Sequence, residues 1–240
     1  MCNYITTLHK KIPALYAMNI NNNVLSDDSI NERLQNMPRE RAEKVRAYKF
    51  LDDRKRSFCA GLLVQAVLGE QVNIQADKYG KPFAKGCPHF SISHSGEWVL
   101  LALCETPVGI DIEKTRSYSQ DKMLAMAKHF LHPAEIETIN AAPDRLARQS
   151  LFIKYWVLKE SYLKMKGTGF FANVSLVHCL FDCHNVQTAF VENEPGIKLT
   201  LYDVSGTSTH YNAAVCSSTH VIWPSEIQVL DAACFLGAAS

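Results

Sequence analysis

The chain has 240 residues, 47% of them apolar, and a formal net charge of +1 at pH 7. This length allows one large domain or two small ones with a buried core, and the apolar content excludes a disordered or fibrous protein. The balanced charge gives no overall attraction for nucleic acid, and because neither a leader sequence nor a membrane-spanning apolar run is visible, we expect a soluble, cytoplasmic protein with no membrane partner.

The first part of the chain predicts helices and strands up to a soft domain boundary near residue 106. Proline, glycine and aspartate mark the turns and helix ends, and alternation of apolar and polar residues marks the strands. The expected elements are a strand at 13–20, a basic helix from Pro38, a buried helix after Leu51 that is capped by Asp52 or Asp53, a turn at 79–82, and strands at 90–94 and 98–104. We therefore divide the chain into two halves, 1–106 and 107–240.

The second part reads as a strand, then helices, then strands. The expected elements are a strand at 108–113, helices at 121–130, from Pro133 and at 144–166, and strands at 174–181, 197–202 and 211–216. Because this order lacks regular alternation of strand and helix, it predicts an α+β fold rather than a parallel doubly wound sheet. The sequence contains neither a Walker loop nor G-x-G-x-x-G, so a standard nucleotide cradle is not expected.

The eight cysteines are scattered singly through these elements, which predicts reduced and mostly buried thiols. One stretch, His178 to His184, briefly resembles a metal site because it also contains Cys179 and Cys183. However, Cys179 falls on the inward face of the expected strand, and the sequence offers no second Cys/His cluster to complete four ligands. We do not expect zinc.

The strand that contains GIDIEK carries two acids on one face. Side chains alternate along a strand, so Asp111 and Glu113 point into the same volume while Ile110 and Ile112 point the other way. The two carboxylates repel each other unless they are neutralised. A divalent cation, a shared proton, or facing Lys and Arg side chains would each do so.

Glu160 in the long predicted helix has two interpretations. It follows Phe152 and Trp156 at four-residue spacing, which aligns its carboxylate with an apolar stripe. A surface ion pair with Lys164 at i,i+4 would account for it simply. The alternative is that Glu160 joins Asp111 and Glu113 around Mg²⁺, which leaves positions open for phosphate oxygens.

Basic and hydroxyl side chains supply what a phosphate-bearing ligand needs. Each of them alone is explained by a solvated surface or a structural hydrogen bond, but Lys159 and Lys164 flank Glu160, and cations beside a candidate metal site favour a polyanionic substrate. The others lie on the two early helices, in the Gly-Lys-Pro turn and at the end of the strand at 90–94, namely Arg41, Lys44, Arg54, Arg56, Lys81, Ser93, His94 and Ser95.

Five motifs together resemble a known family. The stretches YGKP, FSISHSGEW, GIDIEKTR, KHFLHPAE and WVLKESYLKMKGTGF occur in the order and at about the spacing of surfactin-synthetase-type 4′-phosphopantetheinyl transferases, from about Pro38 to Cys216. The resemblance implies a monomer with two similar α+β halves related by a pseudo-twofold axis, and an active site that binds coenzyme A and Mg²⁺ in the cleft between them. The internal repeat is not visible in the sequence.

The resemblance also implies roles for single residues. Asp111, Glu113 and Glu160 match the Mg²⁺ ligands, and the stretch Lys114 to Phe130 matches the region that meets the carrier protein, although it is about four residues longer here. The residues that match coenzyme A contacts are Arg41 (where the family often has Lys), Lys44, Arg56, Lys81, Ser93, His94, Lys159 and Lys164. The N-terminal half would then bind the phosphates, and the C-terminal half would be metal-binding and catalytic.

The implied reaction moves the phosphopantetheine arm of coenzyme A to a serine of an apo acyl or peptidyl carrier protein and releases 3′,5′-ADP. Lys164 and His94 would steady the charge that grows in the transition state. Glu160 would take the serine proton directly or through a metal-bound water, and Glu135 is a second candidate for the base. The sequence does not rank these bases, and it does not name the carrier.

Two other functions remain as alternatives. A non-catalytic module of the same fold would bind coenzyme A or a carrier protein without reaction, but such a module is expected to lose an acid or the K-E-S-x-x-K core, and both are present. A hydrolase with two catalytic carboxylates would explain Asp111 and Glu113 but leaves the lysines without a role.

Overall fold

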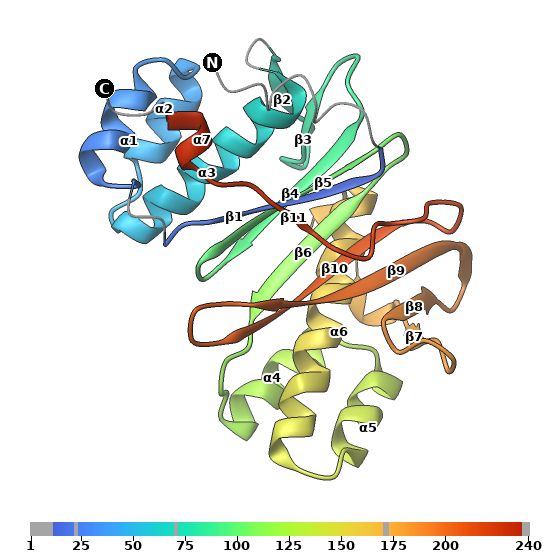
Figure 1. The fold of residues 1–240 in the computed structure, drawn as a ribbon. Coiled ribbons are helices and arrows are strands. Elements are labelled where there is room, and N and C mark those ends of the chain that lie inside the picture. Colours follow the sequence, from blue (N-terminus) through green and yellow to red (C-terminus); the bar gives the residue numbers. More distant parts are fainter. Residues whose placement is uncertain (1–11, 22–23, 70–71, 170–172, 237–240) are drawn as a thin grey trace.

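The computed structural model describes residues 12–21, 24–69, 72–169 and 173–236 (Figure 1). Its first half contains two separate sheets and the helices that pack beside them. The elements in chain order are β1 (Ala14–Asn19), α1 (Asp27–Leu34), α2 (Arg39–Arg46), α3 (Leu51–Leu68), β2 (Ile74–Ala76), β3 (Pro82–Ala84), β4 (His89–Ser95) and β5 (Trp98–Cys104). Strands β2 and β3 form their own small antiparallel pair.

The second half repeats this plan with a longer sheet. Its elements are β6 (Gly109–Lys114), α4 (Gln120–Phe130), α5 (Pro133–Ala141), α6 (Arg145–Lys166), the 3₁₀ turn η3 (Val174–Leu176), β7 (Cys179–Phe181), β8 (Thr188–Val191), β9 (Glu194–Ser205) and β10 (His210–Ser218), and the chain continues into β11 (Gln228–Val229) and α7 (Ala233–Leu236). The mixed content confirms the α+β prediction.

The two main sheets share part of their strand pairing. The first sheet has the order β11-β1-β5-β4 and the second the order β6-β10-β9-β8-β7. In each half the opening strand pairs antiparallel with the last strand of a hairpin, β1 with β5 and β6 with β10, and helices lie between them in the chain. This common topology agrees with the two similar halves that we expected.

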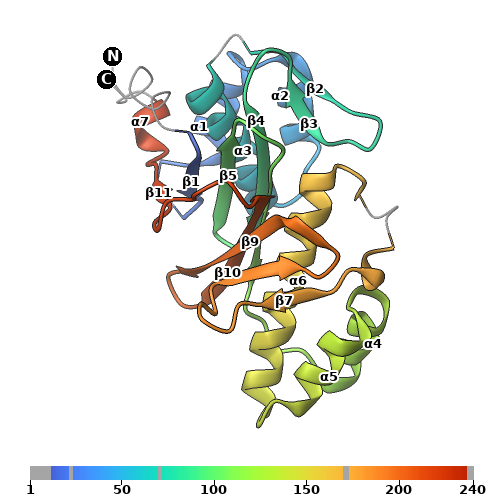
Figure 2. The same cartoon turned by 90° about the vertical axis from the view of Figure 1, so that its right-hand side faces the viewer.

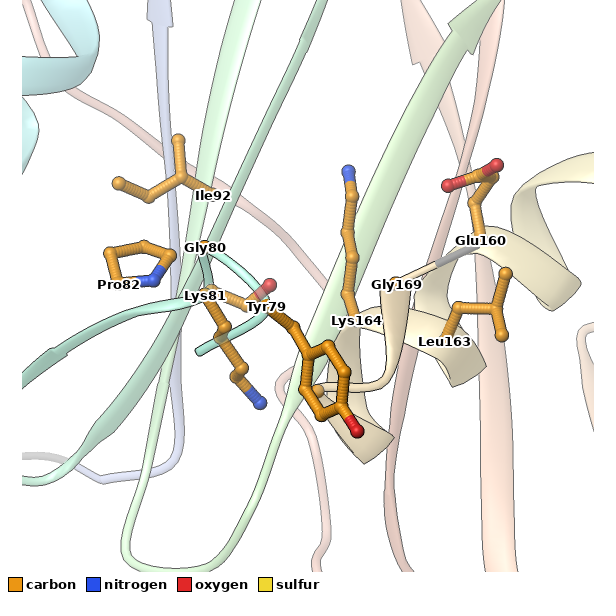
Figure 3. Close-up of a pocket in the computed structure, with 11 residues that line it drawn as sticks. Tyr79, Gly80, Lys81, Pro82, Ile92, Glu160, Leu163, Lys164 and Gly169 are labelled. Carbon is orange, nitrogen blue, oxygen red and sulfur yellow. The ribbon is translucent and has the colours of Figure 1, made fainter. Parts of the chain in front are cut away.

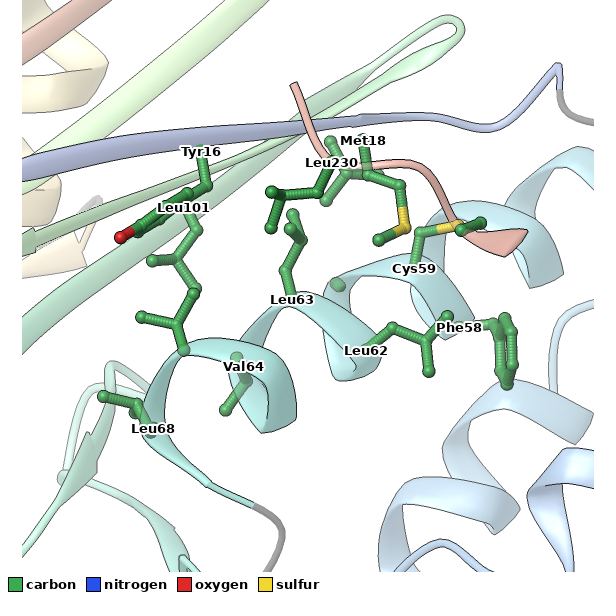
Figure 4. Packing of buried hydrophobic residues seen from close by; sticks show 14 of the residues in the cluster. Tyr16, Met18, Phe58, Cys59, Leu62, Leu63, Val64, Leu68, Leu101 and Leu230 are labelled. Atoms are coloured by element: carbon green, nitrogen blue, oxygen red, sulfur yellow. The ribbon is translucent and has the colours of Figure 1, made fainter. Parts of the chain in front are cut away.

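Three apolar clusters hold the molecule together. One lies between the first sheet and α1 to α3, and it contains Phe58, Leu62 and Leu63 of α3 as well as Met18 and Leu101 of the strands (Figure 4). A second cluster lies between α4 to α6 and the other sheet. The third cluster joins β1 and β5 of one half to β6 and β10 of the other, so the halves share a core.

Local signals determine both ends of α6, the helix that carries Glu160 and Lys164. Asp144 caps its start, where one carboxylate oxygen accepts from the Ala147 amide at 2.8 Å. Gly167 ends it in the left-handed region, with φ of +68°, a conformation that costs glycine little. The predicted helix at 144–166 is therefore confirmed almost to the residue.

The C-terminal segment returns to the first half. Strand β11 pairs parallel with β1, and Leu230 and Ala232 are buried in the first cluster (Figure 2). On its way there, the chain buries Trp223 in the shared core between the halves. The range 107–240 is thus not a self-contained half, because its last elements pack with the other sheet.

Several predicted elements differ from the structure. Residues 174–181 form η3 and the short strand β7 rather than one strand, and α1, β2, β3, β8, β11 and α7 were not predicted. Helix α3 begins at Leu51, so Asp52 and Asp53 do not cap it. They lie in its first turn, where their negative charge interacts favourably with the helix dipole. The buried thiols of Cys59, Cys104, Cys179 and Cys216 agree with the expected reduced cysteines, and within the described ranges no helix is long and apolar enough to span a membrane.

Candidate active site

A glycine brings α6 onto the backbone of β6. A Cβ atom at Gly109 would lie 1.9 Å from the carbonyl oxygen of Ser161 and 2.3 Å from the amide nitrogen of Met165, so only glycine permits this approach. Two and four residues further along β6, the acids Asp111 and Glu113 therefore come close to the next turns of α6. The isoleucines between them are buried in the shared core, as the alternation predicted.

Asp111 is the centre of a hydrogen-bonded cluster that joins three elements. Its Oδ1 accepts from Lys164 Nζ of α6 at 2.7 Å and from Ser93 Oγ of β4 at 2.7 Å. Lys164 Nζ also donates to Ser93 Oγ at 2.9 Å. The Asp111 side chain is 8% exposed and that of Lys164 31%, so a nearly buried carboxylate meets an ammonium that still reaches solvent.

The other two acids lie close enough to Asp111 to change each other's ionisation. Burial, and then the Asp111 and Glu113 charges, raise the pKa of Glu160 to about 7, against the opposing effect of Lys164. Burial also raises the pKa of Glu113, with a smaller contribution from Asp111, while Arg116 lowers it. Arg116 Nη2 lies 3.4 Å from Glu113 Oε1. The three carboxylates thus form one electrostatic cluster, as predicted.

Basic side chains pair with two of these acids in this structure, which is one of the arrangements that the sequence left open. Lys164 pairs with Asp111, and Arg116 pairs with Glu113. The simple helix-surface pair between Glu160 and Lys164 is not among the ion pairs of the described residues, so that interpretation of Glu160 is wrong. Glu160 instead lines a cavity.

The chemistry of these side chains fits a hard cation, because Mg²⁺ prefers oxygen ligands such as carboxylates. Three carboxylates come close here, and the pKa of one of them, Glu160, is raised. Their positions are not those of a preformed site. In the parts of the chain that the structure describes, no three His, Cys, Asp or Glu side chains are arranged to hold a metal ion. The Lys164 ammonium takes the place of a cation at Asp111.

A first cavity of about 250 Å³ opens beside this cluster, between the two halves. Glu160, Leu163 and Lys164 of α6 lie on one side of it, and the turn of Tyr79 to Pro82 lies on the other (Figure 3). The remaining lining residues are Ser91, Ile92, Gly167 and Gly169. The cavity therefore combines an apolar wall with the two charged groups of α6.

A second cavity of about 500 Å³ lies at the other end of β4 and β6. It is lined by Asp53, Arg56, His94, Ser95, Gly96, Glu113, Lys114 and Arg116. Because Asp111 and Ser93 lie between residues that line the two cavities, both open along the same junction of the halves. Four of the lining side chains are basic or imidazole groups, which suits anionic groups of a ligand.

Arg56 and His94, two of the predicted coenzyme A contacts, meet in this second cavity. Arg56 is held by the Gly96 carbonyl at 2.6 Å and by Asp53 Oδ1 at 2.5 Å. Desolvation lowers the pKa of His94, and so do the positive charges of Lys164 and Arg56. His94 is therefore neutral at pH 7, and a bound phosphate would raise its pKa again.

The other predicted phosphate contacts on the first half are spread out. Lys81 Nζ donates to the carbonyls of Met165, at 3.0 Å, and Val108, at 3.3 Å, so it ties the first cavity's turn to the end of α6. Lys44 is exposed on α2. Arg41 packs on Gly61 of α3, and burial lowers its pKa. Its Nε and Nη2 are buried and have no hydrogen-bond partner among the residues that the structure describes.

Comparison with known proteins agrees with this geometry. A family model described as 4′-phosphopantetheinyl transferase superfamily matches residues 107–216, and one described as 4′-phosphopantetheinyl transferase, N-terminal, matches residues 26–106. The 4′-phosphopantetheinyl transferase Sfp of Bacillus subtilis is 30% identical over 80% of this chain and 86% of its own length. The chain belongs to the 4′-phosphopantetheinyl transferase superfamily.

Two further similarities cover a smaller share of this transferase. The 4′-phosphopantetheinyl transferase gsp of Aneurinibacillus migulanus is 30% identical over 70% of this chain and 71% of its own. Among solved structures, the Chronobacterium ammoniagenes ACPS-CoA complex covers 47% of this chain and 97% of its own at 13% identity, with a TM-score of 0.30. The family membership rests on the sequence matches.

Two residues predicted for the active site of this transferase are enclosed elsewhere. Lys159 and Glu135 are both 0% exposed and form an ion pair of 3.0 Å with each other. Lys159 also donates to the carbonyls of Val174 and Val177, and Glu135 accepts from the amides of His132 and Cys179, each at 2.8 Å. Since every one of these partners lies in the second half, we correct both predictions: neither residue is open to coenzyme A or to a carrier serine.

Sequence analysis missed Arg116 as a member of the site and gave Ser95 no partner. Arg116 lies three residues after Glu113 and pairs with it, while Ser95 lines the second cavity. The signals were present, since Arg116 ends the GIDIEKTR motif and Ser95 continues the alternation of Ser91 and Ser93 along β4. Both residues were read only as part of a motif, without a partner.

Proposed function

We propose that this transferase moves the 4′-phosphopantetheine arm of coenzyme A to a serine of an apo acyl or peptidyl carrier protein in a reaction that depends on Mg²⁺. The observation that carries the proposal is the cluster of Asp111, Glu113 and Glu160 with Lys164 between two cavities, at the junction of the halves. A long, polyanionic substrate needs cations and a metal at such a junction.

Asp111, Glu113 and Glu160 are the residues that would hold the metal. Bound there, Mg²⁺ would neutralise the pyrophosphate of coenzyme A and the phosphate that leaves. Lys164 pairs with Asp111 in this structure and would be available to a phosphate oxygen when a metal takes its place, because its side chain lines the first cavity. The chemistry of the acids supports this assignment, because without a cation the ionised carboxylates repel one another.

The basic groups of the second cavity would bind the remaining phosphate charge. Arg56 is held in place by Gly96 and Asp53, so it offers a preorganised guanidinium. His94 gains a proton when an anion binds beside it, which adds a further charge. Arg41, with two unpartnered donors, and exposed Lys44 belong to the same proposal as outer contacts. Lys81 would contribute through its position at the first cavity.

In the transfer, the carrier serine oxygen forms a bond to the β-phosphorus of coenzyme A, and the bond from that phosphorus to the bridging oxygen breaks. The departing 3′,5′-ADP keeps the bridging oxygen and its electron pair. Glu160 is our candidate for the group that takes the serine proton, because its carboxylate lines the first cavity beside the cluster of acids. Lys164 and His94 face the charge that develops on the phosphate.

The carrier would dock on the stretch Lys114 to Phe130. Helix α4 in this stretch buries Met123, Ala127 and Phe130 and leaves Lys122 exposed. Lys114 and Arg116 line the second cavity, so a carrier bound along this stretch would bring its serine to the cluster of acids. We further propose that the protein works as a monomer in the cytoplasm, as the family resemblance implies.

Incubation with coenzyme A and a panel of apo carriers, followed by intact mass measurement, tests the proposal. The carrier mass should rise by one phosphopantetheinyl group, and a metal chelator should abolish the rise. A carrier whose acceptor serine is replaced by alanine is the control, and equal labelling of it would refute the acceptor assignment. Tight binding of coenzyme A without any mass change would favour the non-catalytic module.

A further inference from the structure

Three serines join the edge strands of the two sheets. Strand β4 is the edge of the first sheet and β6 the edge of the second. The backbone amides of β6 that point away from β10 donate to the hydroxyls of β4: Ile110 to Ser91 at 3.1 Å, Ile112 to Ser93 at 3.3 Å, and Lys114 to Ser95 at 3.0 Å. We call these three contacts the serine ladder.

The ladder has the same register as the acids. Each serine accepts from the residue nineteen positions later. The residue one position before each of those amides is Gly109 for the first rung, Asp111 for the second and Glu113 for the third. The two rungs beyond the first therefore each hold the backbone beside a candidate metal ligand, whereas the first rung has no acid.

The second rung also holds the carboxylate itself. Ser93 donates its only hydroxyl proton to Asp111 Oδ1 at 2.7 Å and accepts from Ile112 N and Lys164 Nζ. One proton and two lone pairs are all that a hydroxyl offers, so Ser93 has no capacity left for a phosphate in this state. Ser95 acts on Glu113 through the backbone, because its hydroxyl accepts from the amide of Lys114, the next residue.

Ser93 and Ser95 are almost entirely buried, at 6% and 5% exposure, as is Ser91 at 5%. Burial and full hydrogen bonding keep these side chains in single positions. We infer that Ser93 and Ser95 are positioning residues that hold Asp111 and Glu113 in place for a divalent cation, and that Ser91 serves only to join the halves. This inference rests on the proposed function, and it replaces the predicted phosphate contact of Ser93.

Alanine variants of the three serines test the inference, because Ser91→Ala removes the same backbone contact as the others without touching an acid. Urea unfolding should show comparable losses of stability in Ser91→Ala and Ser95→Ala. Binding of Mn²⁺ to the whole protein with saturating coenzyme A, followed by electron paramagnetic resonance, should weaken by about 10–100-fold in Ser93→Ala and Ser95→Ala. In Ser91→Ala it should stay within about twofold of the wild type, well below that range.

Ser95→Thr keeps the hydroxyl and should restore much of the Mn²⁺ affinity. If Ser93→Ala does not fold, Ser95→Ala alone decides, since Ser95 ends its strand. Equal Mn²⁺ affinity in Ser91→Ala and Ser95→Ala would overturn the inference, whether both match the wild type or both are weakened. A wild-type protein that binds no Mn²⁺ in the presence of coenzyme A would instead refute the proposed metal site, and the inference with it.

Discussion

Replacement of Lys159 by methionine tests whether this lysine is a structural residue or a ligand for coenzyme A. The two roles predict opposite results. Lys159 is 0% exposed and its ammonium contacts Glu135 and the carbonyls of Val174 and Val177. Lys159→Met keeps most of the volume of the aliphatic chain but removes the charge and all three polar contacts.

The expected loss follows from what the substitution leaves behind. The Glu135 carboxylate keeps its two backbone donors but becomes an unpaired buried charge, and two buried carbonyls lose a donor. Breaking one side of a buried ion pair costs about 3–5 kcal/mol. For a chain of this size, the melting temperature should fall by roughly 6–20 °C.

Urea unfolding followed by tryptophan fluorescence measures the loss, with Lys154→Met as the matched control. Lys154 is partly exposed on the same helix and has no ion pair among the described residues, so its replacement should change the free energy of unfolding by less than about 0.5 kcal/mol. Adding Glu135→Gln to Lys159→Met should recover about 1 kcal/mol or more, because the unpaired charge disappears.

Calorimetry of coenzyme A binding, at a temperature where Lys159→Met is still folded, separates the two roles. We expect an affinity within about twofold of the wild type, which is less than 0.5 kcal/mol. The reasoning is refuted if Lys159→Met unfolds like the control and loses coenzyme A affinity tenfold or more. Lys159 would then contact the phosphates, as the sequence suggested, and the buried pair would not persist in solution.

Three further substitutions probe the site. Glu160→Gln should lower turnover by roughly a hundredfold or more. In metal-free buffer the substitution should stabilise the protein by about 1–2 kcal/mol above pH 7 and not below pH 4.5. The reason is that the raised pKa of Glu160, about 7, makes its ionisation destabilise the folded state. Equal urea midpoints of the variant and the wild type at pH 8 would contradict this. Gly109→Ala should lower the free energy of unfolding in urea by at least about 2 kcal/mol and displace α6, since its Cβ would lie 1.9 Å from the Ser161 carbonyl oxygen. Gly196→Ala, whose Cβ would have no described atom within 4 Å, should be neutral. Similar effects of the two substitutions would refute the close contact. Because the pKa of His94 is lowered in the free protein and raised by a bound phosphate, coenzyme A affinity should strengthen as the pH falls from 8 to 6, and His94→Ala should flatten this slope in calorimetry; an unchanged slope would remove His94 from the site.

The sequence by itself determined the features that depend on spacing along one element. The period of two along a strand placed Asp111 and Glu113 on one face, and the charges of both acids contribute to the raised pKa of Glu160. Asp144 and Gly167 set the ends of α6 because capping is local. The motifs also identified the family, since their order and spacing survive substitution between them.

The sequence even held the signal that Lys159 is buried. Phe152, Tyr155, Lys159 and Leu163 recur at three- and four-residue intervals and are all buried in the second half, whereas we followed the neighbouring stripe through Trp156 and Glu160. An apolar stripe on a helix is found from the spacing of its residues. A lysine within such a stripe argues against burial until a partner for its charge is known. That partner, Glu135, lies on another helix.

Only the tertiary structure decided which charges meet. Lys159 and Lys164 lie on the same helix, yet one pairs with a fully buried glutamate in the second half and the other with Asp111 at the junction of the halves. The position of a residue on its own helix or strand fixes the direction of the side chain, while its exposure and pKa depend on elements that are distant in the chain. The serine ladder shows the same limit, because its register becomes visible only when β4 and β6 lie edge to edge.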